Sequence, residues 1–304
     1  VTVNILNKKT ISFNFFSYIK SLLLLMKPRV MSLVIFTSTV GLLTAPVTIS
    51  FYDSIVGIFF VAMGAGAAGA LNMWYEADLD KLMSRTCLRP IPTGKINRKH
   101  ALIFGIILSI VSVFGLYHFS NLLSAFLLLL TISFYLFVYT IWLKRKTPQN
   151  IVIGGASGAL PPVIGWTIAT NSLSIEPLTF FLIIFFWTPS HFWALSLYKA
   201  NDYEKAKIPM LPITNGVEET KKNIFIYSLI MLPIVITPYF IGFVSEIFLI
   251  TSLLLTFYYN YICYDLLRFK KNKFEVNKAK KVFSYSIFYL FLLFVIFLID
   301  QLIR

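Results

Sequence analysis

Long apolar runs recur along the whole chain, and they constrain its fold more than any other feature of the sequence. With 58% hydrophobic and only 13% charged residues, a chain of 304 residues is far too apolar for an ordinary soluble domain. Each run is close to the roughly 20 residues that a helix needs to cross a hydrocarbon core about 30 Å thick. We therefore predict an all-α polytopic membrane protein with nine transmembrane helices. The expected spans are residues 30–47, 54–74, 100–118, 122–143, 150–170, 176–198, 223–243, 246–267 and 282–302.

The basic residues are distributed unevenly between the two sides of these spans. A net charge of +14 could indicate a nucleic-acid partner, so the positions of the cations have to decide. On the nine-span assignment, 26 of the 27 Lys and Arg residues lie on the side of the N-terminus, and only Arg304 lies opposite. This is the positive-inside pattern, which predicts the N-terminus inside and the C-terminus outside. The charge therefore requires no nucleic acid.

The remaining segments predict the organisation and location of the chain. Residues 1–29 are expected to form an N-terminal segment on the inner membrane surface, because KSLLLLMKPR is short, apolar and flanked by cations. Residues 30–304 are expected to form a single membrane domain. The N-terminal stretch has no evident Arg-rich, Ser-rich transit sequence, which favours a bacterial inner (plasma) membrane. Cys87 and Cys263 fall near the inner face, where we expect neither a disulfide nor a metal site.

Two long loops on the inner side, residues 75–99 and 199–222, hold most of the polar residues that could carry chemistry. They follow the second and the sixth span. In the first loop Gly94 comes fourteen residues after Asp80, and in the second loop Gly216 comes fourteen residues after Asp202. A degenerate internal duplication explains this similarity, with each half supplying one polar motif to a common inner cavity. Chance explains it equally well, because Pro and Gly are common in loops.

The first polar motif combines oxygen ligands with cations. Asn72, Glu76 and Asp80 are spaced i, i+4 and i+8, which places them on one face of a helix. Carboxylate and amide oxygens suit Mg²⁺, which usually keeps several waters and is completed by substrate phosphates. Arg85 and Arg89 follow in the same loop and can pair with phosphate oxygens. Ionisable groups at the end of an apolar span are costly, which favours a functional role for the acids over a merely solvated one.

The second polar motif is sparser. His191, Tyr198 and Asp202 are spaced i, i+7 and i+11, which would align them on one helix face with Asp202 at the inner end. Asp202 can help to hold a second Mg²⁺ or orient a water. Tyr198 can ligate through its hydroxyl or present its ring to a carbocation. For His191 two interpretations stay open, a packing residue with a hydrogen bond or a residue that faces a substrate.

The stretch IGGASGALPPVIGW, residues 153–166, is rich in glycine but has no strand before it, as a phosphate-binding loop would require. Small residues at these spacings let membrane helices approach closely. We therefore interpret it as a packing motif.

Four longer segments of the sequence carry a family resemblance. They are KPRVMSLVIFTSTVGLL at 27–43, NMWYEADLDKLMSRTCLRPIPTG at 72–94, IVIGGASGALPPVIGW at 151–166 and HFWALSLYKANDYEKAKIPMLP at 191–212. These segments resemble the UbiA-type intramembrane prenyltransferases, and within that family the haem-modifying branch. Two positions depart from the wider pattern of the family. Glu76 stands where Asp is commoner, and Tyr198 replaces the first acid of the usual second Asp-x-x-x-Asp, a replacement that is usual in the haem branch.

The resemblance implies a nine-helix fold around a lipid-open central cavity, with the active site toward the cytoplasm. It implies that the farnesyl group of farnesyl diphosphate is joined to a vinyl group of haem b with addition of water, giving haem O and diphosphate. A haem O oxygenase is then a candidate downstream partner. Carried over by position, the metal-binding residues are Asn72, Glu76, Asp80 and Asp202. Further roles are expected for Tyr198 beside the reacting carbon, for Arg85, Arg89 and Lys199 at the diphosphate, and for His191 and loop arginines at haem.

Two alternatives stay open at this point. A prenyltransferase that acts on a quinone precursor would share the metal chemistry but not the acceptor. A cation-coupled transporter would also use intramembrane acids, but it predicts them near the bilayer midplane, whereas here they cluster at the inner ends of two spans.

Overall fold

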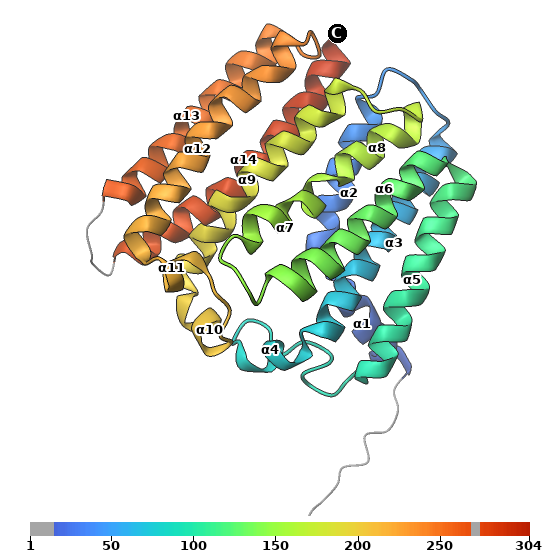
Figure 1. Cartoon of the computed structure of the whole chain (residues 1–304). Helices are drawn as coiled ribbons and strands as arrows, with labels where there is room; N and C mark the ends of the chain where they lie inside the picture. Colours follow the sequence, from blue (N-terminus) through green and yellow to red (C-terminus); the bar gives the residue numbers. More distant parts are fainter. Residues whose placement is uncertain (1–14, 269–273) are drawn as a thin grey trace, which may run out of the picture.

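The protein is described by a computed structural model that covers residues 15–268 and 274–304 (Figure 1). Within these ranges every regular element is a helix and no strand occurs, so the predicted all-α fold is confirmed. The elements are α1 (Phe15–Leu25), α2 (Pro28–Leu43), α3 (Phe51–Tyr75), α4 (Ala77–Leu82), α5 (Arg98–Phe119), α6 (Leu122–Ser133), η1 (Phe134–Leu143), α7 (Asn150–Ala159), α8 (Pro161–Thr170), α9 (Ile175–Tyr198), α10 (Ala200–Lys205), α11 (Leu211–Thr214), α12 (Val217–Phe240), α13 (Glu246–Arg268) and α14 (Phe274–Ile303).

Eight helical stretches of the described chain are long and apolar enough to cross a membrane. They are α3, α5, α6 with η1, α7 with α8, α9, α12, α13 and α14. The span predicted at residues 30–47 corresponds to α2, which is apolar but has only 16 residues and so extends about 24 Å. The chain is therefore a multi-pass membrane protein, whereas a ninth crossing by α2 and the orientation of the termini remain predictions.

Helix α2 packs directly against the backbone of α8. A Cβ atom on Gly41 would lie 2.0 Å from the carbonyl oxygen of Pro162, and one on Gly165 would lie 1.9 Å from that of Ser38. These distances exclude any side chain, so glycine is what allows the two backbones to touch. The contact fixes the short α2 to the bundle, and at Gly165 it agrees with the packing interpretation of residues 153–166.

Helix α1 corresponds to the predicted inner-surface segment, of which residues 1–14 lie outside the described residues. It contacts α3 and α5, and Leu25 at its end is completely buried. Its other side exposes large apolar residues, including Phe16 and Leu23. A helix with one exposed apolar side is typical of a segment that lies in the membrane interface, and this location remains a prediction.

The span predicted at residues 150–170 is broken in the middle. Helix α7 ends at Ala159 and α8 begins at Pro161, with Leu160 between them. Pro161 has no N–H to donate and its ring crowds the preceding turn, so α7 cannot continue regularly through it. The two halves together still have 21 residues, enough for one crossing.

The polar connections gather at one end of the bundle. The short helices α4, α10 and α11 lie at the end opposite to the C-terminus (Figure 1). These helices belong to the two long loops predicted on the inner side, so both loops lie at the same end. The long helices form two cores. Helices α9, α12, α13 and α14 share a large core rich in aromatic residues, and α2, α3, α6 and α8 share a second, mostly aliphatic core.

Candidate functional site

The first polar motif is buried at a break between two helices. Helix α3 ends at Tyr75 and α4 begins at Ala77. The amide of Glu76 nevertheless donates to the carbonyl of Asn72, and the amide of Asp80 to that of Glu76, both at 2.9 Å. This continuous i→i−4 bonding keeps the three side chains on one side, as predicted. All three residues are at most 3% exposed.

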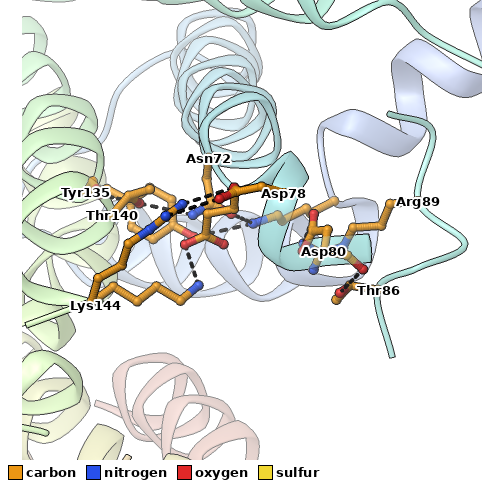
Figure 2. A network of polar contacts seen from close by, with 11 residues as sticks. Asn72, Asp78, Asp80, Thr86, Arg89, Tyr135, Thr140 and Lys144 are labelled. Carbon is orange, nitrogen blue, oxygen red and sulfur yellow. Dashed lines mark hydrogen bonds and ion pairs between the residues drawn. The ribbon is translucent and has the colours of Figure 1, made fainter. Parts of the chain in front are cut away.

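Asn72 lies in a network that includes a lysine from a distant part of the chain. Lys27, which directly precedes α2, donates from Nζ to Asn72 Oδ1 at 2.5 Å and to the Tyr135 hydroxyl at 3.4 Å. Asn72 in turn donates from Nδ2 to Thr140 Oγ1 at 3.0 Å (Figure 2). Burial and the nearby Arg89 guanidinium lower the pKa of Lys27 to about 7. The amide oxygen that could bind a metal is therefore already occupied by an amine.

The two carboxylates of the motif are held by ion pairs. Lys144 Nζ lies 2.5 Å from Glu76 Oε1, an oxygen that accepts no hydrogen bond of regular geometry within the described chain. Arg89 Nη1 donates to both carboxylate oxygens of Asp80 at 2.9 Å, and the Thr86 hydroxyl donates to the Asp80 carbonyl at 3.1 Å (Figure 2). A buried carboxylate is strongly unfavourable without such a partner. Lys27, Lys144 and Arg89 are referred to below as the cation network.

A π-helix supplies three members of the site. In η1 the amide of Lys144 donates to the carbonyl of Tyr139, five residues earlier, at 3.0 Å, and Thr140 Oγ1 donates to the carbonyl of Tyr135 at 2.8 Å. The wider turn brings Tyr135, Thr140 and Lys144 to the side that faces the buried motif. Such helices are uncommon and occur frequently at functional sites.

The second polar motif departs from the prediction of one continuous helical row. Helix α9 ends at Tyr198 and α10 begins at Ala200, so Asp202 belongs to a separate short helix. The amide of Asp202 donates to the carbonyl of Lys199 at 3.0 Å, an i→i−3 bond that breaks the register of α9. The row of His191, Tyr198 and Asp202 is therefore wrong as predicted, because it assumed an unbroken α-helix.

Asp202 connects the second loop to the first. The Ser84 hydroxyl donates to its carboxylate at 2.7 Å, and the Ser84 amide donates at 3.4 Å. This hydroxyl holds the pKa of the Asp202 carboxyl below its usual range, and Lys199 and Lys205 act in the same direction against burial. Asp202 is therefore an ionised carboxylate at neutral pH, and it is available at the junction of the two loops.

The two inner loops also pack together and share local geometry. Each contains a helix of six residues, α4 or α10, directly after a long helix. Gly94 and Gly216 both adopt positive φ angles, of 74° and 87°. These parallels favour internal duplication over chance, and the two loops meet as predicted. Their shared apolar cluster consists of Leu79, Met83, Tyr203, Ala206, Ile208 and Met210 together with Ile151 from α7.

His191 lies in the aromatic core rather than in the cation network. Its Nδ1 is 2.7 Å from Ser286 Oγ, and its ring stacks on Trp187 at 4.3 Å and on Phe283 at 4.6 Å between ring centroids. Both faces of the imidazole are therefore covered, which agrees with a packing residue that makes a hydrogen bond. A role at haem remains a prediction.

The other predicted loop residues lie at the margin of the site. Arg85 is exposed and forms no ion pair in the described part of the chain, and Lys199 is partly buried where α9 ends. Asp78 is exposed and forms an ion pair with Arg145 at 3.0 Å. Tyr198 is partly buried, with Lys280 Nζ 6.0 Å from its ring centroid.

Sequence reasoning missed the residues that contact the motif from α2 and η1. Lys27 and Lys144 were counted only as evidence for orientation, and the hydroxyl groups of Tyr135 and Thr140 were treated as part of an apolar span. A usable signal was present, because polar groups that recur within a membrane span usually serve a function or pair with one another.

The donor set fits Mg²⁺ better than a metal that the protein binds alone. In the described part of the chain, no three His, Cys, Asp or Glu residues come close enough together to hold an ion. Glu76 and Asp80 offer two buried carboxylates and Asn72 offers one amide oxygen, all of which are hard ligands. An incomplete set of this kind is what Mg²⁺ uses when waters and substrate phosphates complete its coordination.

Comparison with known proteins agrees with the resemblance in the sequence. The model of the UbiA prenyltransferase family matches residues 33–295. A protein of Pelagibacter ubique named protoheme IX farnesyltransferase is 69% identical over 96% of this chain and 95% of its own length. A protein of the same name from Bartonella bacilliformis is 51% identical over 92% of this chain and 90% of its own.

Solved structures show the same fold at low sequence identity. Digeranylgeranylglyceryl phosphate synthase has a TM-score of 0.78 and 17% identity, covering 94% of this chain and 99% of that one. A UbiA homologue of Archaeoglobus fulgidus bound to DMAPP and Mg²⁺ has a TM-score of 0.67 and 18% identity, covering 91% and 99%. From the extent of the sequence matches, the chain belongs to the UbiA prenyltransferase family.

Proposed function

We propose that this protein transfers the farnesyl group of farnesyl diphosphate to a vinyl group of haem b, with addition of water, to give haem O and diphosphate. The observation that carries the proposal is the 69% identity over nearly the full chain to a relative named for this reaction. The site supports it, because buried acids and basic residues at one end of a membrane bundle suit a metal-bound diphosphate.

The proposed Mg²⁺ ligands are Asn72, Glu76 and Asp80, with Asp202 approaching from the second loop. The fit rests on their oxygen donors and their burial. Bound there with a diphosphate, Mg²⁺ would supply charge neutralisation that makes the diphosphate a better leaving group. A Mg²⁺ ion and an allylic diphosphate, DMAPP, are named together for the Archaeoglobus fulgidus homologue.

The cation network has a second role in this proposal. Lys27, Lys144 and Arg89 contact the side chains that would bind the metal, so they must release them when the metal–diphosphate complex binds. The released ammonium and guanidinium groups then lie next to the diphosphate and stabilise the negative charge that develops on it. Arg85 and Lys199, which are not paired in the described chain, add positive charge at the margin.

The departing diphosphate leaves an allylic cation at C1 of the farnesyl group. The rings of Tyr135 and Tyr139 stack at 5.4 Å beside the motif, and Lys27 and Lys144 lie 5.8 and 5.6 Å from their respective centroids. Rings that already face a cation can stabilise a carbocation in its place. The haem vinyl group attacks C1, water adds to the resulting cation next to the porphyrin, and the released diphosphate takes up the proton that this water loses. Tyr198 is proposed to help position these groups.

The site would face the cytoplasm of a bacterial cell across its inner membrane. Support comes from the charge asymmetry of the nine-span assignment and from the position of both long loops at one end of the bundle (Figure 1). A haem O oxygenase in the same membrane would be the natural recipient of the product, since haem O is poorly soluble in water.

The direct test is to incubate the purified protein in lipid nanodiscs with haem b, farnesyl diphosphate and Mg²⁺, and to measure haem O by mass spectrometry. The expected product has the mass of haem b plus one farnesyl group and one hydroxyl group. Asp80→Asn is expected to abolish it, and Asp78→Asn, about half a helical turn away on the exposed side, serves as the matched control. Unmodified haem together with a prenylated phenolic acceptor would instead assign the protein to quinone-type substrates.

A further inference from the structure

An apolar cavity of about 130 Å³ lies between α2, α3, α6 and the junction of α7 with α8. Its lining is mostly aliphatic. Apart from Tyr135, two lining residues carry hydroxyl groups, Thr131 and Ser157. Both hydroxyls are hydrogen-bonded within their own helices, since Thr131 donates to the Leu127 carbonyl and Ser157 to the Gly154 carbonyl. The walls therefore offer no unpaired polar group and suit a hydrocarbon chain.

The polar end of this cavity borders the cation network next to the first motif. Lys27 and Tyr135 line it, and Lys27 donates to Asn72 Oδ1. A molecule that fills the cavity would thus have a hydrocarbon part along α2 and α3 and a negatively charged head at the cation network. An isoprenoid diphosphate has this polarity.

We propose that the cavity holds the hydrocarbon tail of the diphosphate donor and that Gly158 determines how long a tail it accepts. The assignment deepens the proposed function and rests on it. It is carried by the continuity between cavity and motif and by the unusual surroundings of Gly158, described next.

Gly158 differs from its neighbours in the glycine-rich stretch. A Cβ on Gly154 would lie 2.2 Å from the Tyr139 ring, and one on Gly155 would lie 3.1 Å from Thr188. Gly158 is exposed and lines the cavity, and a Cβ on it would meet nothing within 4 Å. The first two glycines therefore allow packing, whereas the missing side chain of Gly158 leaves free space. The packing interpretation of this stretch does not hold for Gly158.

Substitution of Gly158 should change the preferred tail length without removing the chemistry. We expect Gly158→Leu to lower kcat/KM for farnesyl diphosphate about tenfold relative to geranyl diphosphate, because each methylene excluded from an apolar pocket costs about fourfold in binding. Gly158→Ala should shift the same ratio by about twofold to fourfold. Ile153 is likewise exposed on the same helix but does not line the cavity, so Ile153→Phe should leave the ratio unchanged.

The experiment measures kcat/KM with geranyl, farnesyl and geranylgeranyl diphosphate, haem b and Mg²⁺ in nanodiscs of constant lipid composition. A second readout needs no haem, namely the thermal stabilisation by farnesyl diphosphate beyond that by inorganic diphosphate, both with Mg²⁺. Gly158→Leu should reduce this excess and leave the response to inorganic diphosphate intact. If Gly158→Leu does not accumulate, Gly158→Ala decides alone by the sign of its shift.

The outcomes separate this inference from the proposed function. Wild-type ratios in both Gly158 variants, with haem prenylated normally, would overturn the assignment of the cavity and show that a lipid acyl chain or no chain occupies it. A wild-type protein that binds farnesyl diphosphate through a Gly158-dependent cavity but never modifies haem would support the assignment and refute the acceptor.

Discussion

Replacement of Lys144 by methionine provides a sharp test of the cation network. The side chains of Lys144 and Glu76 are only 15% and 4% exposed and lie 2.5 Å apart. Methionine retains most of the aliphatic stem but removes the charge, which leaves a buried carboxylate without its partner. Breaking a buried ion pair from one side typically costs about 3–5 kcal/mol of unfolding free energy.

An orphaned carboxylate can limit this loss by taking up a proton. An ordinary glutamate has a pKa of about 4.3, which is about 2.7 units below pH 7. Protonating it at pH 7 therefore costs about 3.7 kcal/mol, at about 1.36 kcal/mol for each unit. We therefore expect Lys144→Met to lose about 3–4 kcal/mol at pH 7 in metal-free buffer. The folded variant then binds a proton that the unfolded chain does not, so its unfolding free energy rises as the pH falls, by up to about 1.4 kcal/mol at pH 6.

The double variant Lys144→Met, Glu76→Gln distinguishes lost charge compensation from lost packing. It should regain stability to within about 1–2 kcal/mol of wild type, because no uncompensated charge remains. Denaturant unfolding in detergent micelles at pH 6 and 7 measures these values, with Lys146→Met, an exposed cation nearby, as the control. A loss below about 1 kcal/mol for Lys144→Met, or no recovery in the double variant, would refute the reasoning.

Three further outcomes are expected. Chelation of divalent cations should abolish prenyl transfer, and added Mg²⁺ should restore it. Mass spectrometry of the haem product measures both effects. Asp78→Asn should change the unfolding free energy by less than about 1 kcal/mol, because its ion pair with Arg145 is exposed and largely screened, and chemical denaturation measures this. Gly165→Ala should sharply reduce the yield of folded protein in size-exclusion chromatography, because its methyl group would overlap the α2 backbone, whereas Gly158→Ala should fold normally.

Most of the fold follows from features that the sequence carries locally. Eight of the nine spans expected from hydropathy coincide with long apolar helices of the described chain. The reason is that each crossing must satisfy its own backbone hydrogen bonds within one apolar run. The departures occur where one residue breaks the regular helix. Pro161 divides the fifth span, and α9 ends at Tyr198, so Asp202 leaves the predicted row. A helical period applied to a sequence assumes that the helix continues, and it fails at such breaks.

The contacts from η1, which are Tyr135, Thr140 and the following Lys144, could not be found in the same way, because the assumed α-helical period is wrong in η1. In an α-helix Thr140 and Lys144 would lie about 140° and 180° around the axis from Tyr135, on other faces. In the π-helix η1, with about 4.4 residues per turn, these angles fall to about 50° and 20°. The wider turn therefore creates the face that meets Asn72 and Glu76. It also places the charge of Lys144 where it compensates a buried carboxylate.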